Sequence, residues 1–218
     1  MKKAAVAGPD RRPRRTAPGE DRRQAILEAA REVFLERGYA ETNIDAVVER
    51  AGASKATVYA LFGNKDGLFN AVTTLCGTQF AAVVEGVEVS TSAADNLRQL
   101  ARMYCKGAFH PTTLAMFRLA VGESGRRPDS GDVFYRLGPR VIMGAVAKFF
   151  RECMDKGALE TSDPEQLADC FLASLRGTLF NRAVMNPTRI PTQPELDKHI
   201  DFVVETFLRG VQPRAKAR

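Results

Sequence analysis

Histidine is scarce in this chain of 218 residues, which contains two copies, His110 and His199. The sequence also lacks an H-E-x-x-H segment, a glycine-rich phosphate loop and the G-x-S-x-G turn that exposes a nucleophilic serine. These absences exclude the common arrangements of catalytic and metal-binding side chains. We therefore expect that the protein is not an enzyme, with no catalytic residues, no cofactor and no metal site.

Cysteine is sparse as well, and the four copies, Cys76, Cys105, Cys153 and Cys170, stand far apart. No pair has the spacing of a zinc site or of a redox motif. Each lies in an apolar helical segment, where a free thiol behaves as a small hydrophobic group. We expect free thiols in a reducing cytoplasm, and a thiol sensor is the alternative.

Long apolar runs are also missing. No segment approaches the roughly 18 apolar residues that a membrane-spanning helix needs. Pro9 and Asp10 interrupt the N-terminal segment before the core of a signal peptide can form. The sequence therefore predicts a cytoplasmic protein with no membrane partner.

The net charge of +6 is concentrated in two tails. Residues 1–19 carry +5 and Pro213–Arg218 carry +3, whereas residues 20–80 carry −2 and residues 81–212 are balanced. The first tail is either a solvated, disordered segment or an arm that neutralises the phosphates of a nucleic acid. We expect ordered structure to begin near Glu20.

Apolar residues recur at helical spacing along the rest of the chain, which predicts an all-α fold of about nine helices. An apolar fraction of 44% is enough for a sizeable core. Gly122–Gly131 is the clearest internal loop, and Pro139 predicts a kink or a break in the helix expected from Asp132 to Lys156. The other expected helices cover about 21–37, 44–51, 54–61, 65–84, 94–109, 112–123, 164–185 and 195–209.

The segment Asn43–Phe62 is composed of a helix, a tight turn with glycine and a second short helix, which is the pattern of a helix-turn-helix. The second helix presents Lys55, Thr57 and Tyr59, and such polar groups suit the phosphates and base edges of DNA. Its small alanines would let the backbone approach a groove closely. An ordinary pair of helices with a polar face is the alternative.

Segment 20–80 resembles the DNA-binding domain of the tetracycline-repressor (TetR) family. The matching parts are F-x-x-x-G-Y, then T-x-I-x-x-V, A-G-x-S-K-x-T-x-Y-x-x-F and N-K-D-x-L-F, all in one register. The resemblance implies a three-helix N-terminal domain that binds double-stranded operator DNA. It also implies a C-terminal helical domain, over 81–212, that dimerises and holds a small-molecule effector.

The resemblance also implies roles for individual residues. Tyr59 and Lys65 match positions that contact the DNA backbone, and Asn43 stands where the second helix meets a phosphate. The groove-facing start of the recognition helix comprises Ser54, Lys55, Ala56, Thr57 and Ala60. Ala60 and Leu61 replace larger polar residues, so we expect sparse base readout and more weight on DNA shape and backbone contacts.

In the C-terminal half, "VGESGRRPDSGDVFYRLGP" resembles the AefR-like subgroup of the family. By the family plan, the last two helices pair with those of a second copy to form a homodimer. Their apolar faces carry Phe171, Leu172, Leu175 and Leu179 on one helix and Ile200, Val203, Val204 and Phe207 on the other. The alternative is that these faces only fill the core of one copy.

An effector pocket should form among the helices between 94 and 185. The expected lining residues are Met103, Phe109, Met116, Phe117, Phe134 and Met143, because methionine and phenylalanine suit an adaptable apolar cavity. For each of them, plain core packing is the alternative. His110 and Glu123 are candidate polar determinants.

Together these features predict a repressor that a small apolar or amphipathic ligand releases from its operator. The alternatives are an activator and a DNA-binding regulator without a ligand.

Overall fold

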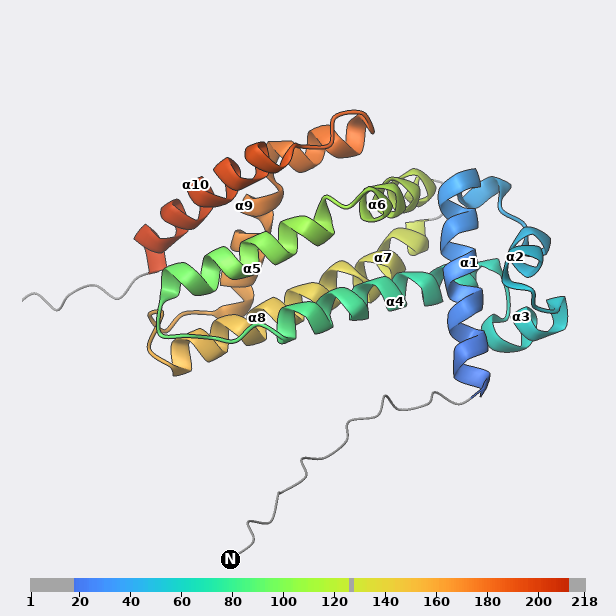
Figure 1. Ribbon diagram of the computed structural model, residues 1–218, viewed down its shortest axis with the longest axis horizontal. Helices are drawn as coiled ribbons and strands as arrows, with labels where there is room; N and C mark the ends of the chain where they lie inside the picture. The colour runs from blue at the N-terminus through green and yellow to red at the C-terminus, as the bar shows by residue number, and fades with distance from the viewer. Residues whose placement is uncertain (1–17, 126–127, 212–218) are drawn as a thin grey trace, which may run out of the picture.

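The computed structural model describes residues 18–125 and 128–211, which form ten α-helices and contain no strand (Figure 1). The all-α prediction is confirmed. The basic segments at the two ends lie outside the described residues, except that Pro18 and Gly19 already belong to the first helix.

The N-terminal helices form a small unit at one end of the molecule, which we call the head (Figure 1). It comprises α1 (Pro18–Glu41), α2 (Ile44–Ala51), α3 (Lys55–Phe62) and the start of α4 (Lys65–Glu85). Its core is a buried apolar cluster to which all four helices contribute: Ile26, Leu27, Val33, Phe34, Val47, Val58, Leu68 and Val72. Burial of these side chains holds helices of eight residues that would not be stable alone.

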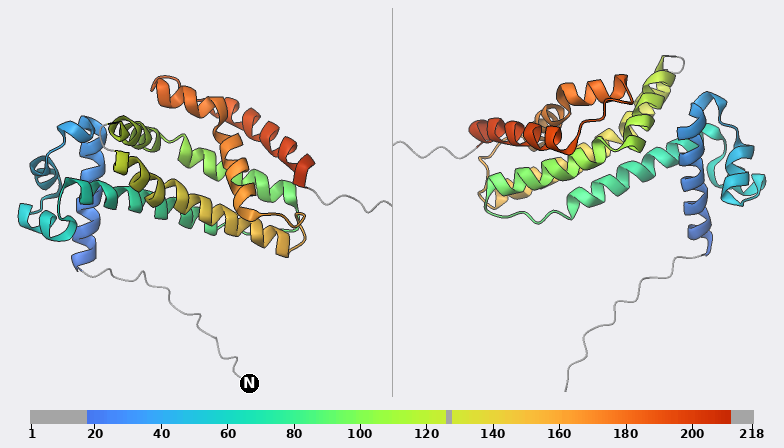
Figure 2. Two further views of the ribbon diagram at one scale, coloured as in Figure 1. Left: turned by 180° about the vertical axis from the view of Figure 1, so that it is seen from behind. Right: turned by 45° about the horizontal axis from the view of Figure 1, so that its top comes forward.

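The remaining helices form the body, in which most helices run roughly side by side and the first part of the orange helix crosses the others steeply (Figure 2). They are α5 (Ala93–Ala108), α6 (Pro111–Ser124), α7 (Pro128–Leu137), α8 (Pro139–Asp155), α9 (Pro164–Met185) and α10 (Gln193–Val211). Contacts between α8, α9 and α10 centre on three aromatic rings, Phe150, Phe171 and Phe207. The body thus has its own hydrophobic core.

Helix α4 belongs to both units. Leu68, Phe69 and Val72 are buried in the core of the head, whereas Ala81 and Val84 are buried in the core of the body, where α4 packs along α8. The division expected after residue 80 therefore falls inside one continuous helix. The expectation that no segment is long and apolar enough to span a membrane was wrong for α4, which contains an 18-residue window with a mean hydropathy of 1.3. Part of this window, 39%, is buried, and α4 packs against α1, α7 and α8.

The structure has a break at Pro139, one of the two alternatives that the sequence predicted there. The helix expected from Asp132 to Lys156 is divided at Gly138-Pro139 into α7 and α8, which accounts for the tenth helix. Two other features differ from the sequence-based expectation. The loop expected over Gly122–Gly131 is shorter, because α6 continues to Ser124 and α7 begins at Pro128. Helix α9 contains a break at Gly177 (φ 45°, ψ −151°) that was not expected.

The apolar faces expected to pair with a second copy lie mostly within the protomer. Phe171, Leu172 and Leu175 of α9 are buried, and so are the residues of α10 that face them, Ile200, Val203 and Val204. Leu179 and Phe207 are half-buried against the same core. The alternative interpretation, an intramolecular core, therefore describes these side chains correctly.

Candidate nucleic-acid interface and cavity

Helix α3 is positioned by local hydrogen bonds at the turn that precedes it. Gly52 adopts a left-handed conformation (φ 59°, ψ 33°) that ends α2, and the Ala53 N–H donates to the Val48 carbonyl at 3.1 Å. The Oγ of Ser54 then accepts from the Thr57 N–H at 3.1 Å, capping α3. The turn is therefore set by one glycine and one hydroxyl.

The two faces of α3 differ sharply in exposure. Val58 and Phe62 are buried in the head, 1% and 9% exposed, as expected for its inward face. On the outward face Ser54, Lys55, Ala56, Tyr59 and Ala60 are exposed, and Thr57 is half-buried. The residues expected to meet DNA thus share one solvent-facing surface. That they contact DNA stays a prediction.

Asn43 and Lys55 already have partners within the head. The Oδ1 of Asn43 accepts from the Ala46 N–H at 2.9 Å and caps α2. The Lys55 ammonium lies 2.8 Å from the Asp45 carboxylate, and this hydrogen bond raises the pKa of Lys55. Because both side chains of the ion pair are exposed, a DNA phosphate can replace Asp45 at little energetic cost.

Lys65 has a structural role that the sequence did not reveal. Its ammonium donates to the carbonyl oxygens of Tyr39 (2.9 Å), Ala40 (3.1 Å) and Thr42 (2.9 Å), and it lies 4.6 Å from the centre of the Tyr39 ring. The first residue of α4 therefore closes the end of α1, where backbone carbonyls lack helical partners. The expected phosphate contact of Lys65 stays a prediction beside this one.

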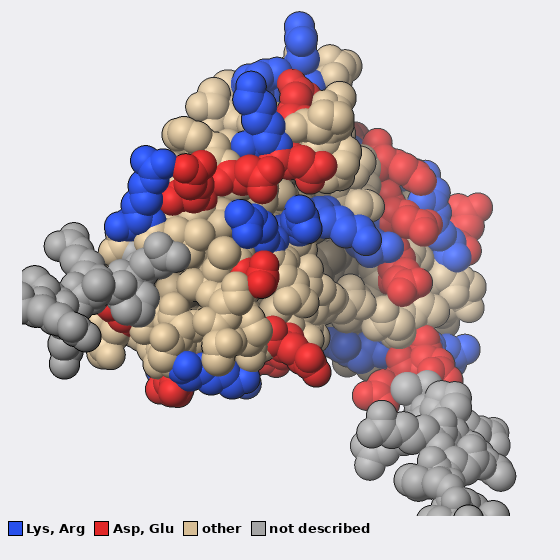
Figure 3. Space-filling model, turned by 60° about the vertical axis from the view of Figure 1, so that its left-hand side comes forward, with Lys and Arg blue, Asp and Glu red and all other residues tan. Residues whose placement is uncertain are grey.

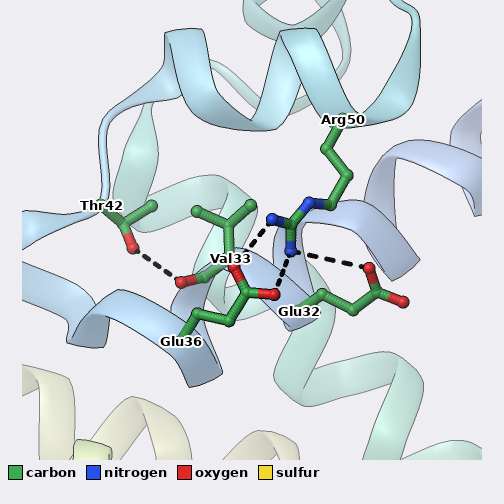
Figure 4. A network of polar contacts seen from close by, with 5 residues as sticks. All are labelled: Glu32, Val33, Glu36, Thr42 and Arg50. Atoms are coloured by element: carbon green, nitrogen blue, oxygen red, sulfur yellow. Dashed lines mark hydrogen bonds and ion pairs between the residues drawn. The ribbon is translucent and has the colours of Figure 1, made fainter.

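A second set of polar contacts fixes α2 against α1 (Figure 4). The Arg50 guanidinium donates to both oxygens of Glu36, at 2.6 and 2.7 Å, and lies 3.7 Å from Glu32. The hydrogen bond from Arg50 lowers the pKa of Glu36. The Thr42 hydroxyl lies 2.6 Å from the Gly38 carbonyl and 3.4 Å from that of Val33. These contacts orient the helix that precedes the turn.

The head is also tied to α4 by an aromatic cluster. The rings of Phe34, Tyr39 and Phe69 lie 5.3–5.9 Å apart, and the Tyr39 hydroxyl hydrogen-bonds to Asp66. Together with Lys65, these residues make the end of α1 and the start of α4 one rigid corner.

The surface charge of the body is mixed. Acidic and basic side chains alternate over the face in Figure 3, between broad areas of uncharged residues. This matches the balanced charge of residues 81–212. The body therefore offers no strong attraction for a polyanion on this face.

A cavity of about 160 Å³ lies in the body, beside α4. Six helices and the turn between α7 and α8 form its wall. The lining residues include Thr73, Cys76, Gly77 and Phe80 of α4, Tyr104 and Ala108 of α5, Thr112, Thr113, Met116 and Phe117 of α6, Phe134 and Tyr135 of α7, Gly138, Pro139, Ile142 and Met143 at the turn and in α8, and Asp169, Leu172, Arg176 and Phe180 of α9. Most of this lining is apolar or aromatic, as in sites for small organic molecules.

Four of the six residues expected to line an effector pocket lie at this cavity, namely Met116, Phe117, Phe134 and Met143. The other two do not. Phe109 is buried, 4% exposed, with its ring 5.8 Å from that of Phe180, and Met103 packs against the core of the body. Met103 lies on α5 and Phe109 directly follows its last residue, and both pack in or against the core, so for them the core-packing alternative holds.

Sequence reasoning missed Phe80, Tyr104 and Arg176 at the cavity. The three residues come from three different helices, so their positions in the sequence do not indicate that they line a common cavity rather than the core or the surface. Of the two polar candidates, His110 caps α6 by accepting from the Thr112 N–H, and Glu123 lines a separate pocket between α4, α6 and α7. Neither lies at the cavity.

The cysteines fit the interpretation of ordinary thiols better than that of a sensor. Cys105 and Cys153 are buried, and burial raises the pKa of Cys105 to about 12 and that of Cys153 to about 11. Burial also raises the pKa of Cys76. A thiol with a raised pKa is a poor nucleophile at neutral pH. Cys170 is exposed on α9.

Comparison with known protein families decides the identity of this fold. Residues 26–72 match the family of bacterial regulatory proteins named tetR, and residues 95–210 match the C-terminal domain of AefR-like transcriptional repressors. The chain belongs to the TetR family of transcriptional regulators. The two matches cover the head and most of the body, so the resemblance seen in the sequence is confirmed in both halves.

Individual transcriptional regulators are similar over most of this chain. An uncharacterized HTH-type transcriptional regulator, YhgD of Bacillus subtilis, is 28% identical over 77% of this chain and 87% of its own length. A putative TetR-family regulator from Mesorhizobium loti superposes with a TM-score of 0.81 at 26% identity, covering 91% of this chain and all of that one. The flavonoid-responsive regulator FrrA gives a TM-score of 0.69 at 30% identity, over 90% of this chain and all of FrrA.

Proposed function

We propose that this TetR-family protein is a cytoplasmic, homodimeric repressor that a small apolar or amphipathic ligand releases from its operator. The observation that carries the proposal is the outward face of α3, where Lys55, Thr57 and Tyr59 stand on a helix fixed from beneath by Val58 and Phe62. A rigid, short helix with a polar outer face and small residues suits the major groove.

We assign DNA binding to the head, within residues 20–80, and binding of the ligand and of the second copy to the body, within residues 81–212, with the later part of α4 shared by both units because it lines the cavity. Helices α9 and α10 are the proposed dimer elements, through their outward sides. Phe202 on α10 is 69% exposed, and Ala173, Ser174 and Thr178 on α9 are exposed small residues. Exposed apolar and small side chains on adjacent helices allow close packing of a four-helix bundle.

Release is proposed to act through α4. Thr73, Cys76, Gly77 and Phe80 form one wall of the cavity, and two residues, Gly63-Asn64, join the same helix to α3. The dimer is proposed to have two states, one in which the two heads have the spacing of the operator half-sites and one in which they do not. A ligand that binds the second state more tightly shifts the dimer toward it. The ligand thereby lowers the affinity for the operator, by as much as its affinities for the two states differ. The name of FrrA, a flavonoid-responsive relative, supports a ligand of this kind.

The first experiment selects duplexes from a random-sequence library with the full chain and measures the mass of the complex. We expect an inverted repeat with half-sites about one helical turn apart, occupied by an even number of protomers. A complex with one protomer, or selection without any shared sequence, would contradict the proposal.

A second measurement separates the proposed repressor from the activator alternative. The selected site is placed over a promoter and transcribed in vitro with increasing protein. A fall in transcript supports the repressor, whereas a rise would show that the activator interpretation is the correct one.

A further inference from the structure

Two polar side chains from different helices line the same cavity. Tyr104 of α5 and Arg176 of α9 both line the cavity, and the positive charge of Arg176 acts on the titration of the Tyr104 hydroxyl. Burial is the larger influence and raises the pKa of Tyr104 to about 12, so this hydroxyl keeps its proton and acts as a hydrogen-bond donor at neutral pH.

Within the part of the chain that the structure describes, these two groups have no hydrogen-bond or ion-pair partner. Tyr104 is 6% exposed, and its ring packs edge-on against Phe80 at 5.8 Å. Arg176 is half-buried, and its guanidinium lies 6.0 Å from the centre of the Phe180 ring. No buried side-chain nitrogen or oxygen among the described residues lacks a hydrogen-bond partner, so the Tyr104 hydroxyl, which makes no hydrogen bond, is accessible from the cavity that it lines. Tyr104 and Arg176 are therefore two donors that border the same cavity.

The rest of the wall is aromatic. Phe117 lies 5.2 Å from Phe180 and 6.2 Å from Phe134, edge to face, and Met116 and Met143 close the sides. A volume of about 160 Å³ is similar to that of the roughly 150 Å³ cavity known to admit benzene. The space therefore fits one six-membered ring with a small substituent.

We propose that the cavity binds a monocyclic aromatic carboxylate, with its ring among the phenylalanines and its carboxylate on Arg176 and Tyr104. A guanidinium stays charged in proteins and matches a carboxylate in a bidentate pair. A ligand that excludes water from Arg176 without supplying a negative charge would leave that charge buried and unpaired. Asp169 also borders the cavity but is exposed, so the carboxylate belongs at the Arg176 end. This inference rests on the proposed function only in taking the cavity as the effector site.

The break in α9 supports this placement. Gly177 interrupts the helix directly after Arg176, and the Nε2 of His199 lies 3.1 Å from the carbonyl oxygens of both Ser174 and Leu175. In an unbroken helix those carbonyls would accept from the backbone four residues on. His199 of α10 thus holds the segment of α9 that precedes Arg176, and this contact fixes the backbone from which the guanidinium extends.

The test measures binding to the full-length protein without DNA, by calorimetric titration with benzoate and cinnamate and with the matching amides. We expect the carboxylates to bind at least tenfold more tightly than their amides. Arg176→Gln should remove this preference, Tyr104→Phe should weaken carboxylate binding severalfold, and Arg176→Lys should retain part of the preference. Arg102→Gln, an exposed arginine on α5, is the matched control and should bind as the wild type does.

Three outcomes overturn the inference: equal binding of carboxylates and amides, an unchanged preference in a folded Arg176→Gln variant, or no binding of either carboxylate. Circular dichroism identifies a variant that fails to fold. If Arg176→Gln does not fold, the inference is tested by the carboxylate-over-amide preference of the wild-type protein and by its partial retention in Arg176→Lys. Because no DNA is present, failure here leaves operator binding untouched. A carboxylate that binds without releasing operator DNA would instead contradict the proposed release.

Discussion

At the scale of single residues, Lys65 shows how one side chain can carry two roles. Its place in the N-K-D-x-L-F segment implies a contact with the DNA backbone, and that segment is readable in the sequence. The three carbonyls that its ammonium meets at the end of α1 lie more than twenty positions away along the chain. No local pattern could have predicted them, because they depend on how α4 packs against α1.

Replacing Lys65 with methionine keeps the length of the side chain and removes its three donors. We expect the free energy of unfolding to fall by about 1–3 kcal/mol, because carbonyls at the end of α1 lose a charged partner. Urea denaturation measures the change. Lys55→Met is the control and should shift stability by less than about 1 kcal/mol, since its pair with Asp45 is exposed.

A Lys65→Met variant as stable as Lys55→Met would show that the cap adds nothing. The salt dependence of DNA binding is a separate readout of the same variant. A shallower slope marks a phosphate contact, and an unchanged slope leaves Lys65 with the structural role alone.

The buried thiols predict a loss of stability in alkali. Burial raises the pKa of Cys105 to about 12 from its ordinary value of 9.0, so between these pH values the unfolded chain loses a proton that the folded chain keeps. The free energy of unfolding should therefore fall as pH rises from about 9 to 12. In Cys105→Ala this fall, measured by urea denaturation at several pH values, should be less steep. Equal steepness in the two proteins would mean that Cys105 is not protected.

At the scale of elements, the helix starts were among the most predictable features. The helices expected from 44, 54, 65 and 164 begin within one residue of those positions, and the side chains of Asn43, Ser54, Asn64 and Asp163 accept from backbone N–H groups there. The break of α9 at Gly177 was missed, because the apolar spacing on its two sides continues as if the helix were unbroken. Only the approach of His199 from α10 accounts for it.

Gly177→Ala tests that break. At φ 45° and ψ −151° an alanine is strained, and its Cβ would meet the His199 ring at 3.4 Å, so we expect a loss of about 1–3 kcal/mol. Gly144→Ala in α8 is the matched control. Its Cβ would meet nothing within 4 Å, and in a helix the change should stabilise by about 0.5–1 kcal/mol. Thermal unfolding ranks the two variants, and a stabilised Gly177→Ala would show that α9 can straighten.

At the scale of the whole molecule, the sequence predicted the class of fold and the location of the α3 surface, but only part of the cavity. The outer face of α3 follows from one short motif, whereas the cavity draws on six helices. Met116, Phe117, Phe134 and Met143 were expected because of their residue type. Residue type alone also selected Phe109, which packs in the core. Which apolar side chains border a vacant space depends on the packing angles of the helices, which spacing does not encode.

The balance of charge across the molecule limits how DNA can be bound. The head carries a net charge of −2 over residues 20–80, and the body is neutral. Affinity for DNA must therefore come from a few individual side chains and backbone groups on α3 and near its ends. The basic segment of residues 1–19, most of which lies outside the described residues, is a second source of positive charge.

Contact between the outer face of α3 and DNA is the central feature of the proposed function. Fluorescence anisotropy with a duplex selected by the wild-type protein tests it directly, using Thr57→Val and, as the matched control, Thr161→Val in the exposed segment before α9. We predict that Thr57→Val binds about tenfold more weakly, as expected for the loss of one good polar contact, and that Thr161→Val binds as the wild type does. Equal binding by a folded Thr57→Val variant, or wild-type binding no tighter to the selected duplex than to a scrambled one, would contradict the account.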